Sequence, residues 1–148
     1  MDLIDKRSGL NLLMSAAANN TVPAIKVLLE MRANVNAVSS QPQAGCSALL
    51  LAAAAGHSGA VSLLIEAKAK VDPPLLNAAE KKGWSALQAA STAGHLETVR
   101  LLLRHGARTD ILHPTTGTSA VEAAEMYGHT TIALLVRSPG VLSCGVAA

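Results

Sequence analysis

Residues 83–110, GWSALQAASTAGHLETVRLLLRHGARTD, contain two helix-like segments separated by a Gly-His pair. Ser85 precedes the first segment, and serine is a preferred N-cap because its hydroxyl accepts a hydrogen bond from a free backbone N–H. Gly94 stands where that segment must stop and reverse, and glycine enters the left-handed conformation without a Cβ penalty. The second segment carries the apolar pattern of a helix buried along a broad face. The stretch therefore predicts a helix, a tight turn and a second helix.

The same unit occurs four times in the chain. Its copies, numbered 1 to 4, begin at Gly9, Gly45, Gly83 and Gly117. An N-cap residue type follows in each copy: Asn11, Ser47, Ser85 and Ser119. Each turn has Asn or Gly: Asn20, Gly56, Gly94 and Gly128. The second helices repeat an apolar stripe: Ile25, Val27 and Leu28; Val61, Leu63 and Leu64; Val99, Leu101 and Leu102; Ala133, Leu135 and Val136. Because neither helix of a copy can bury its stripe alone, we expect neighbouring copies to stack.

These four copies resemble the ankyrin repeat family, whose pattern is Gly-x-Thr-Pro-Leu-His-x-Ala-Ala, then Gly-His, then Val-x-Leu-Leu. Tetratricopeptide repeats have a similar period, but their Trp-x-x-Leu-Gly-x-x-Tyr spacing is missing. The resemblance implies an all-α solenoid of stacked helix–turn–helix units with extended, β-hairpin-like loops. We expect a single domain over residues 1–148, with repeats at about 5–37, 42–72, 80–112 and 114–137 and a C-terminal tail at 138–148.

The chain departs from the family pattern at two kinds of position. The family's Pro is absent from every copy, and its His is replaced by Met14, Leu50, Gln88 and Glu122. The Gly that ends the second helix survives only as Gly106, with Arg32 and Lys68 at the matching positions. A left-handed residue with a Cβ costs about 1 kcal/mol or more. We therefore expect moderate stability.

Composition excludes several classes of protein. The net charge of +2 is too small to indicate nucleic-acid binding. Residues 48–55 form the longest apolar run, which is far shorter than the roughly 20 residues that span a bilayer. The N-terminus is acidic, unlike a signal peptide, and Cys46 and Cys144 lack metal-ligand spacing. We expect free thiols and an intracellular, cytoplasmic protein, with the nucleus or an organelle as alternatives.

The resemblance also implies a protein-binding groove, lined by the loops around each first glycine and by the ends of the first helices. Together with the loop residues described below, the candidate binding residues are Arg7, Leu10, Asn19, Gln43, Cys46, Leu75, Leu76, Lys81, Lys82, Trp84, Thr92, Thr115, Thr118, Met126 and Tyr127. Trp and Tyr often carry binding energy at interfaces. Trp84 and Tyr127 are therefore either partner contacts or, in the case of Trp84, part of the packing of its own loop.

The loop at residues 72–82 is longer than its counterparts and carries Leu75 and Leu76 on what should be an exposed finger. An apolar loop tip is either folded back as a lid or covered by a partner, and we favour a partner. The ends of the array raise a similar question. Copy 1 presents Leu12, Leu13 and Met14, and the chain closes on the apolar stretch SPGVLSCGVAA, although repeat arrays normally have polar caps. We expect a piece of a larger chain, or a subunit whose ends are covered in an assembly.

Sites for chemistry find little support in the sequence. The histidines that follow the turn glycines are His57, His95 and His129, and their repeat spacing favours a structural role. His105 and His113 have no partners at metal-ligand spacing. Arg100, Arg104 and Arg108 form a row at helical spacing, either a solvated face or a contact for an acidic or phosphate-rich partner. We expect no enzyme, no metal and no cofactor.

Two functions remain open at this stage. The first is a non-catalytic module that binds a partner protein through the groove and fingers. The second is a constitutive structural subunit, buried in a larger complex through its apolar finger and uncapped ends.

Overall fold

The structure is a computed structural model, which describes residues 10–39, 46–69, 85–113 and 116–138. These residues contain eight α-helices in chain order: α1 (Leu12–Ala18), α2 (Val22–Glu30), α3 (Ala48–Ala55), α4 (Ser58–Glu66), α5 (Ala86–Ala93), α6 (Leu96–Arg104), α7 (Ala120–Met126) and α8 (Thr130–Arg137). Each copy supplies one helical pair, and no strand occurs within these ranges. The all-α prediction is confirmed.

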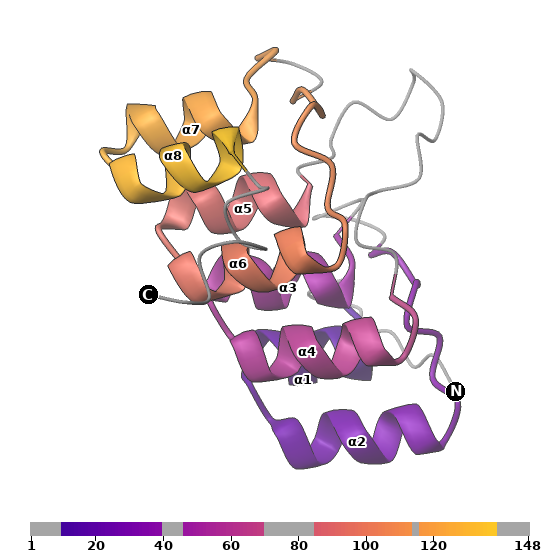
Figure 1. Cartoon of the computed structure of the whole chain (residues 1–148). Helices are drawn as coiled ribbons and strands as arrows, with labels where there is room; N and C mark the ends of the chain where they lie inside the picture. Colours follow the sequence, from indigo (N-terminus) through magenta and orange to yellow (C-terminus); the bar gives the residue numbers. More distant parts are fainter. Residues whose placement is uncertain (1–9, 40–45, 70–84, 114–115, 139–148) are drawn as a thin grey trace, which may run out of the picture.

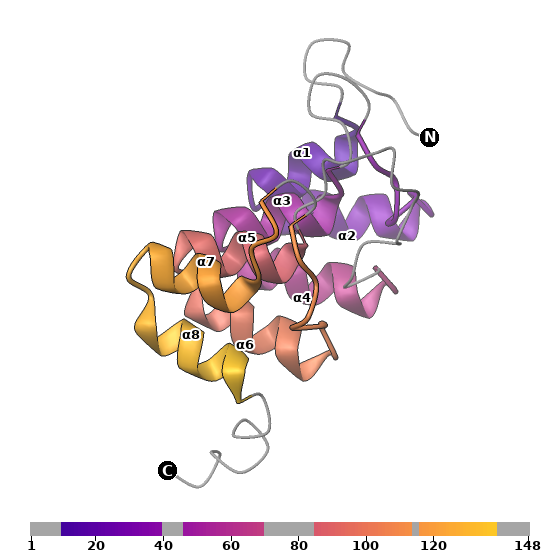
Figure 2. The ribbon, with the colours of Figure 1, turned by 90° about the horizontal axis from the view of Figure 1, so that it is seen from above.

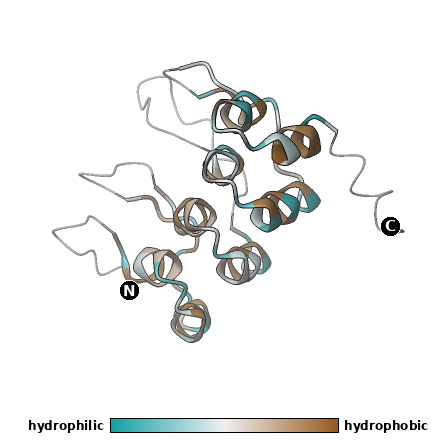
Figure 3. Cartoon of the chain, turned by 90° about the vertical axis from the view of Figure 1, so that its left-hand side faces the viewer, coloured by the Kyte–Doolittle hydropathy of each residue, from teal (hydrophilic) through white to brown (hydrophobic). Residues whose placement is uncertain are grey.

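The helices form two rows that stack copy by copy (Figures 1 and 2). In the first row α1, α3, α5 and α7 each contact the next, and in the second row α2, α4, α6 and α8 do the same. Within every copy the two helices also pack on each other. Figure 3 looks along the helices and shows both rows from their ends. The stack has two terminal faces, one on copy 1 and one on copy 4.

All four first helices begin at the residues that the sequence predicts. Asn11 accepts a hydrogen bond from the backbone N–H of Met14 at 2.9 Å. Ser47, Ser85 and Ser119 make the matching bond in the other copies. These bonds satisfy a backbone donor that has no partner inside the helix.

The core consists mainly of alanine and leucine, as the near-absence of aromatic residues requires. The first helices contribute small side chains such as Ala52 and Ala90, which are fully buried and let successive helices approach closely. Leucines such as Leu64 and Leu102 on the second helices fill the space between the rows. Burial of each such side chain contributes roughly 1.5–3 kcal/mol before entropy is counted.

Three expectations about copy 1 were wrong. Leu13 and Met14, expected at an exposed end, are each 1% exposed, because they belong to the core that α1 shares with α2 and α3. Val27, expected in the buried stripe, is 52% exposed because none of the described helices packs on its side of α2. Leu12 is half exposed, as expected.

The second helices end in left-handed residues even where glycine is missing. The backbone φ is +59° at Arg32 and +69° at Lys68, close to the +82° of Gly106. At all three positions the next backbone N–H bonds back to the last turn of the helix, for example Ala69 to the carbonyl of Leu64 at 2.9 Å. The fold therefore imposes the same conformation on residues that adopt it at a cost.

We predict that Lys68→Gly stabilises the chain by about 1 kcal/mol, because glycine removes the Cβ strain of a left-handed residue. Urea unfolding measures the change. Lys68→Ala is the matched control, and it should give no comparable gain because alanine keeps the Cβ. Equal stabilisation by both substitutions would assign the effect to the lysine side chain instead.

Candidate protein-binding surface

A histidine from each later copy ties it to the copy before. His57, His95 and His129 stand at the start of the second helices of their copies. Each side-chain Nε2 lies 3.1 Å from a carbonyl oxygen near the end of the first helix in the copy before. The acceptors are Ala18, Ala54 and Thr92. These histidines have the structural role that the sequence favoured, and they hold the ends of the first helices in one row.

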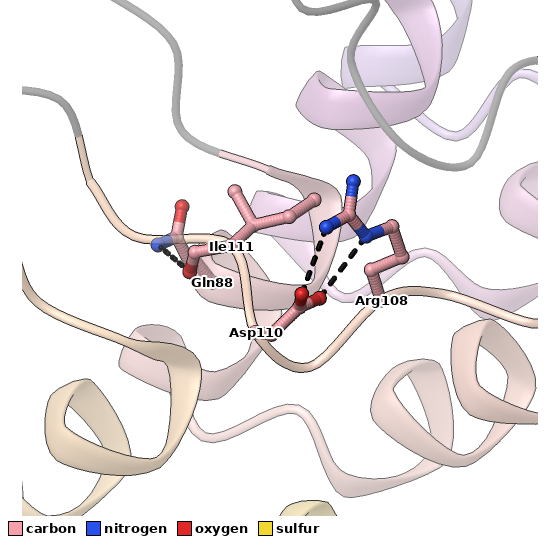
Figure 4. A network of polar contacts seen from close by, with 4 residues as sticks. All are labelled: Gln88, Arg108, Asp110 and Ile111. Atoms are coloured by element: carbon pink, nitrogen blue, oxygen red, sulfur yellow. Dashed lines mark hydrogen bonds and ion pairs between the residues drawn. The ribbon is translucent and has the colours of Figure 1, made fainter.

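Gln88 organises the loop between copies 3 and 4. Its Nε2 donates to the carbonyl oxygen of Ile111 at 3.0 Å (Figure 4). The same Nε2 donates to the carbonyl oxygen of Thr118 at 2.9 Å, and Oε1 accepts from the N–H of Ser85. His113 donates its own N–H to the same Thr118 carbonyl. In copy 3, Gln88 occupies the position where the family has His. Its hydrogen bonds hold the base of the loop. Met14 and Leu50 have no polar hydrogen that could do the same.

The basic row expected on the second helix of copy 3 is wrong for Arg108, because α6 ends at Arg104 and Arg108 lies in the loop beyond it. Arg108 binds both carboxylate oxygens of Asp110, at 3.0 and 2.8 Å (Figure 4). On the helix, Arg100 lies 3.4 Å from Glu97. The bond from Arg108 holds the pKa of Asp110 below its usual 3.8. The pair is therefore formed at neutral pH and is lost only when the pH falls through that lowered pKa. Exposed pairs of this kind fit the interpretation of a solvated face.

The two described ends of the loop between copies 1 and 2 pair as the base of a hairpin. Val38 and Ser47 form an antiparallel bridge, and the N–H of Ser39 donates to the carbonyl of Cys46 at 2.8 Å. The N–H of Cys46 donates in turn to the Ser39 hydroxyl at 3.1 Å. Cys46 therefore contributes its backbone to the hairpin, and its free thiol is half buried.

The candidate residues that the structure describes fall into two groups. Leu10, Cys46, Thr92 and Thr118 are half buried, and the last three hold neighbouring segments through their backbones or hydroxyls. Asn19, Met126 and Tyr127 are exposed at the ends of first helices. The remaining candidates lie outside the described residues: Arg7, Gln43, Leu75, Leu76, Lys81, Lys82, Trp84 and Thr115.

Two of the exposed candidates, Asn19 and Tyr127, belong to a row with one member per copy. The residue before each turn is exposed in every copy, namely Asn19, Ala55, Ala93 and Tyr127. Because the first helices contact one another in sequence, these residues follow the stack. We call this the first-helix row. The two middle residues of the row have small side chains. At one end Tyr127 is 61% exposed, and its neighbour Met126 is 74% exposed.

Several exposed apolar side chains were not selected from the sequence, namely Met31, Val38, Leu112 and Leu134. Leu112 lies in the loop that Gln88 holds, and Leu134 lies on α8. Leu112 and the half-buried Ile111 stand between polar residues. No repeating pattern marks Leu112 as exposed, so its position in a polar loop was the one available signal. Leu134 occupies a position that is Lys26, Ser62 and Arg100 in the other copies, and that contrast is a usable signal.

The family model described as "Ankyrin repeats (3 copies)" matches residues 1–74 and 70–142, which is nearly the whole chain. The chain belongs to the ankyrin repeat family. Ankyrin repeats generally mediate protein–protein interactions, and the family is typically non-catalytic. No curated protein matches the sequence.

The described part of this ankyrin-repeat chain offers no arrangement for metal chemistry. No group of three or more His, Cys, Asp or Glu side chains within it could hold a metal ion. Likewise, none of its helices is both long and apolar enough to cross a bilayer. What the described residues do present is an aligned, partly apolar surface.

Proposed function

We propose that this ankyrin-repeat chain is a non-catalytic module that binds a partner protein through its groove and loop fingers, with Tyr127 and Met126 as anchors. The observation that carries the proposal is the first-helix row, in which Tyr127 protrudes at one end beside small residues, with the exposed Met126 next to it. Small residues such as Ala55 and Ala93 would allow a partner's backbone to approach closely. Tyrosine at the end of such a row supplies apolar area and a hydroxyl for hydrogen bonding.

The alternative of a constitutive subunit depends chiefly on Leu75 and Leu76, which lie outside the described residues. Its other basis is the exposed apolar end of copy 1, where Leu12 is 49% exposed. The two functions differ in the residue that matters most, so one experiment can separate them.

A photo-crosslinking amino acid placed at residue 127 in the full chain should capture one partner protein from the native extract. The same probe at residue 134 is the matched control, because Leu134 is similarly exposed on the second row. With the captured partner purified, Tyr127→Ala should weaken binding by about 10-fold or more, as hot-spot residues do. Unchanged affinity for Y127A, together with loss on replacing Leu75 and Leu76, would reject the proposal in favour of the constitutive subunit.

A further inference from the structure

The two terminal faces of the stack differ in chemistry. On copy 4, the C-terminal face consists of Glu122, Glu125, Leu134 and Arg137. Glu125 occupies a position that is Ala17, Ala53 and Ser91 in the other copies, all of them buried against the next copy. It is instead exposed and forms an ion pair with Arg137, which replaces the aliphatic Leu29, Ile65 and Leu103. Copy 4 is therefore closed by charge and cannot receive another copy in the usual way.

On copy 1, the N-terminal face consists of Leu12, Ala24, Val27 and Met31, all exposed and all apolar. The positions of Leu12 and Ala24 are buried in every other copy, against the copy before: Ala48, Ala86 and Ala120 for the first, Ala60, Thr98 and Ile132 for the second. The face therefore continues the interface that joins the copies, and none of the described helices packs on it.

The exposed seam of α2 has the spacing of a helix-packing surface. Ala24, Val27 and Met31 are separated by three and four residues, which places them on one side of the helix as in packed helical pairs. Val27 is 52% exposed and Met31 is 51% exposed. A second helix laid antiparallel with its Val27 opposite this one would bring each Met31 beside the first turn of the other helix, where Pro23 and Ala24 are exposed. Two copies of the seam would therefore place apolar side chains opposite apolar side chains.

Leu12 is too large for the contact that a preceding repeat of the ordinary kind would make with copy 1. The other three copies have alanine there, and those alanines are almost fully buried by the copy before. A leucine adds three carbon atoms to a contact that the other copies pack with a methyl group, and overpacking of that kind is destabilising. A partner that is not bound to the spacing of the solenoid avoids this conflict.

We propose that two copies of this chain associate through their N-terminal faces, with a two-fold axis passing close to Val27. A two-fold contact uses the same patch on both molecules and closes after one pair forms. The closed C-terminal faces would then point outward, which excludes head-to-tail growth. The first-helix rows of both molecules stay uncovered, so the dimer would present two partner-binding surfaces.

Sedimentation equilibrium on the full chain tests the association. We expect dimer at micromolar concentrations and at least a 10-fold rise in the dimer dissociation constant for Val27→Glu. Leu134→Glu, an equally exposed position on the C-terminal face, should leave the dimer intact. Circular dichroism checks that both variants keep the fold. A wild-type chain that stays monomeric up to about 0.5 mM, where even a weak dimer would be populated, overturns the proposal.

A disulfide test checks the symmetry, in a background with Cys46→Ser and Cys144→Ser. Val27→Cys treated with oxidised glutathione should cross-link to itself, because a two-fold axis brings the two introduced thiols together, whereas Leu134→Cys should not. Cross-linking between the two variants in an equal mixture would instead show head-to-tail stacking and would overturn the two-fold arrangement. Absence of any cross-link in Val27→Cys, with dimer present, would do the same.

Discussion

Ala53→Glu is expected to destabilise the chain by about 4 kcal/mol. Ala53 is fully buried on α3 against copy 3, and a glutamate there would carry a carboxylate into a contact that has no arginine to pair with. Leaving a buried charge uncompensated costs roughly 3–5 kcal/mol. Copy 4 has this glutamate naturally, as Glu125, because there the side chain reaches solvent and Arg137. Urea or guanidinium unfolding measures the loss, and a protein that no longer folds meets the expectation as well.

Two matched substitutions separate the charge from the position. Ala53→Ser should cost less, about 1–2 kcal/mol, because copy 3 accommodates Ser91 at the same position although the buried hydroxyl has no hydrogen-bond partner there. Glu125→Ala should change stability by at most about 1 kcal/mol, as expected for an exposed ion pair. If A53E and A53S proved equally mild, copy 3 would not cover Ala53 as the structure has it, and the assignment of a closed end would fail with it.

Gly56→Ala is expected to cost about 2–3 kcal/mol. Gly56 has a φ of +76°, and a Cβ there would lie 2.4 Å from Nδ1 of His95. The left-handed backbone alone costs about 1–2 kcal/mol with a Cβ. The ring must also move, and because its Nε2 is bonded to the carbonyl of Ala54, that movement loses a hydrogen bond of about 1 kcal/mol.

Gly128 supplies the control for this prediction. Its φ is +77°, but a Cβ at this residue would meet nothing within 4 Å, because no further copy is stacked there. Gly128→Ala should therefore cost only the strain of the left-handed backbone. In a His95→Ala background, Gly56→Ala should also fall to that smaller value, since the clash is gone. Equal costs for G56A and G128A in the parent chain would show that the His95 ring can move away from the new Cβ without loss of stability.

The sequence determined the repeat and most of its local structure. The N-caps, such as Ser85, and the turn glycines, such as Gly94, could be read directly because capping and left-handed turns need particular residue types at particular positions. The strained ends at Arg32 and Lys68 followed from alignment with Gly106. The spacing of His57, His95 and His129 was enough to predict a structural role for them. It did not predict which carbonyl groups they bind.

The candidate surface could be predicted only in part. Alignment placed Tyr127 and Met126 in the exposed set, and the structure agrees. It also placed Thr92 and Thr118 there, but their exposure is reduced by contacts with other copies, such as the bond from His129 to the Thr92 carbonyl. Those contacts join residues 30 or more positions apart, and a local pattern does not contain them.

Only the tertiary structure decided which residues each copy covers. The same aligned position is buried at Ala53 and exposed at Glu125, and the same stripe is half buried at Leu63 and exposed at Val27. Repeats make local structure predictable because each copy folds by the same short-range rules. Burial depends instead on whether a neighbour is stacked on that side, and for this reason the sequence determined the repeat while the stack decided its open and closed ends.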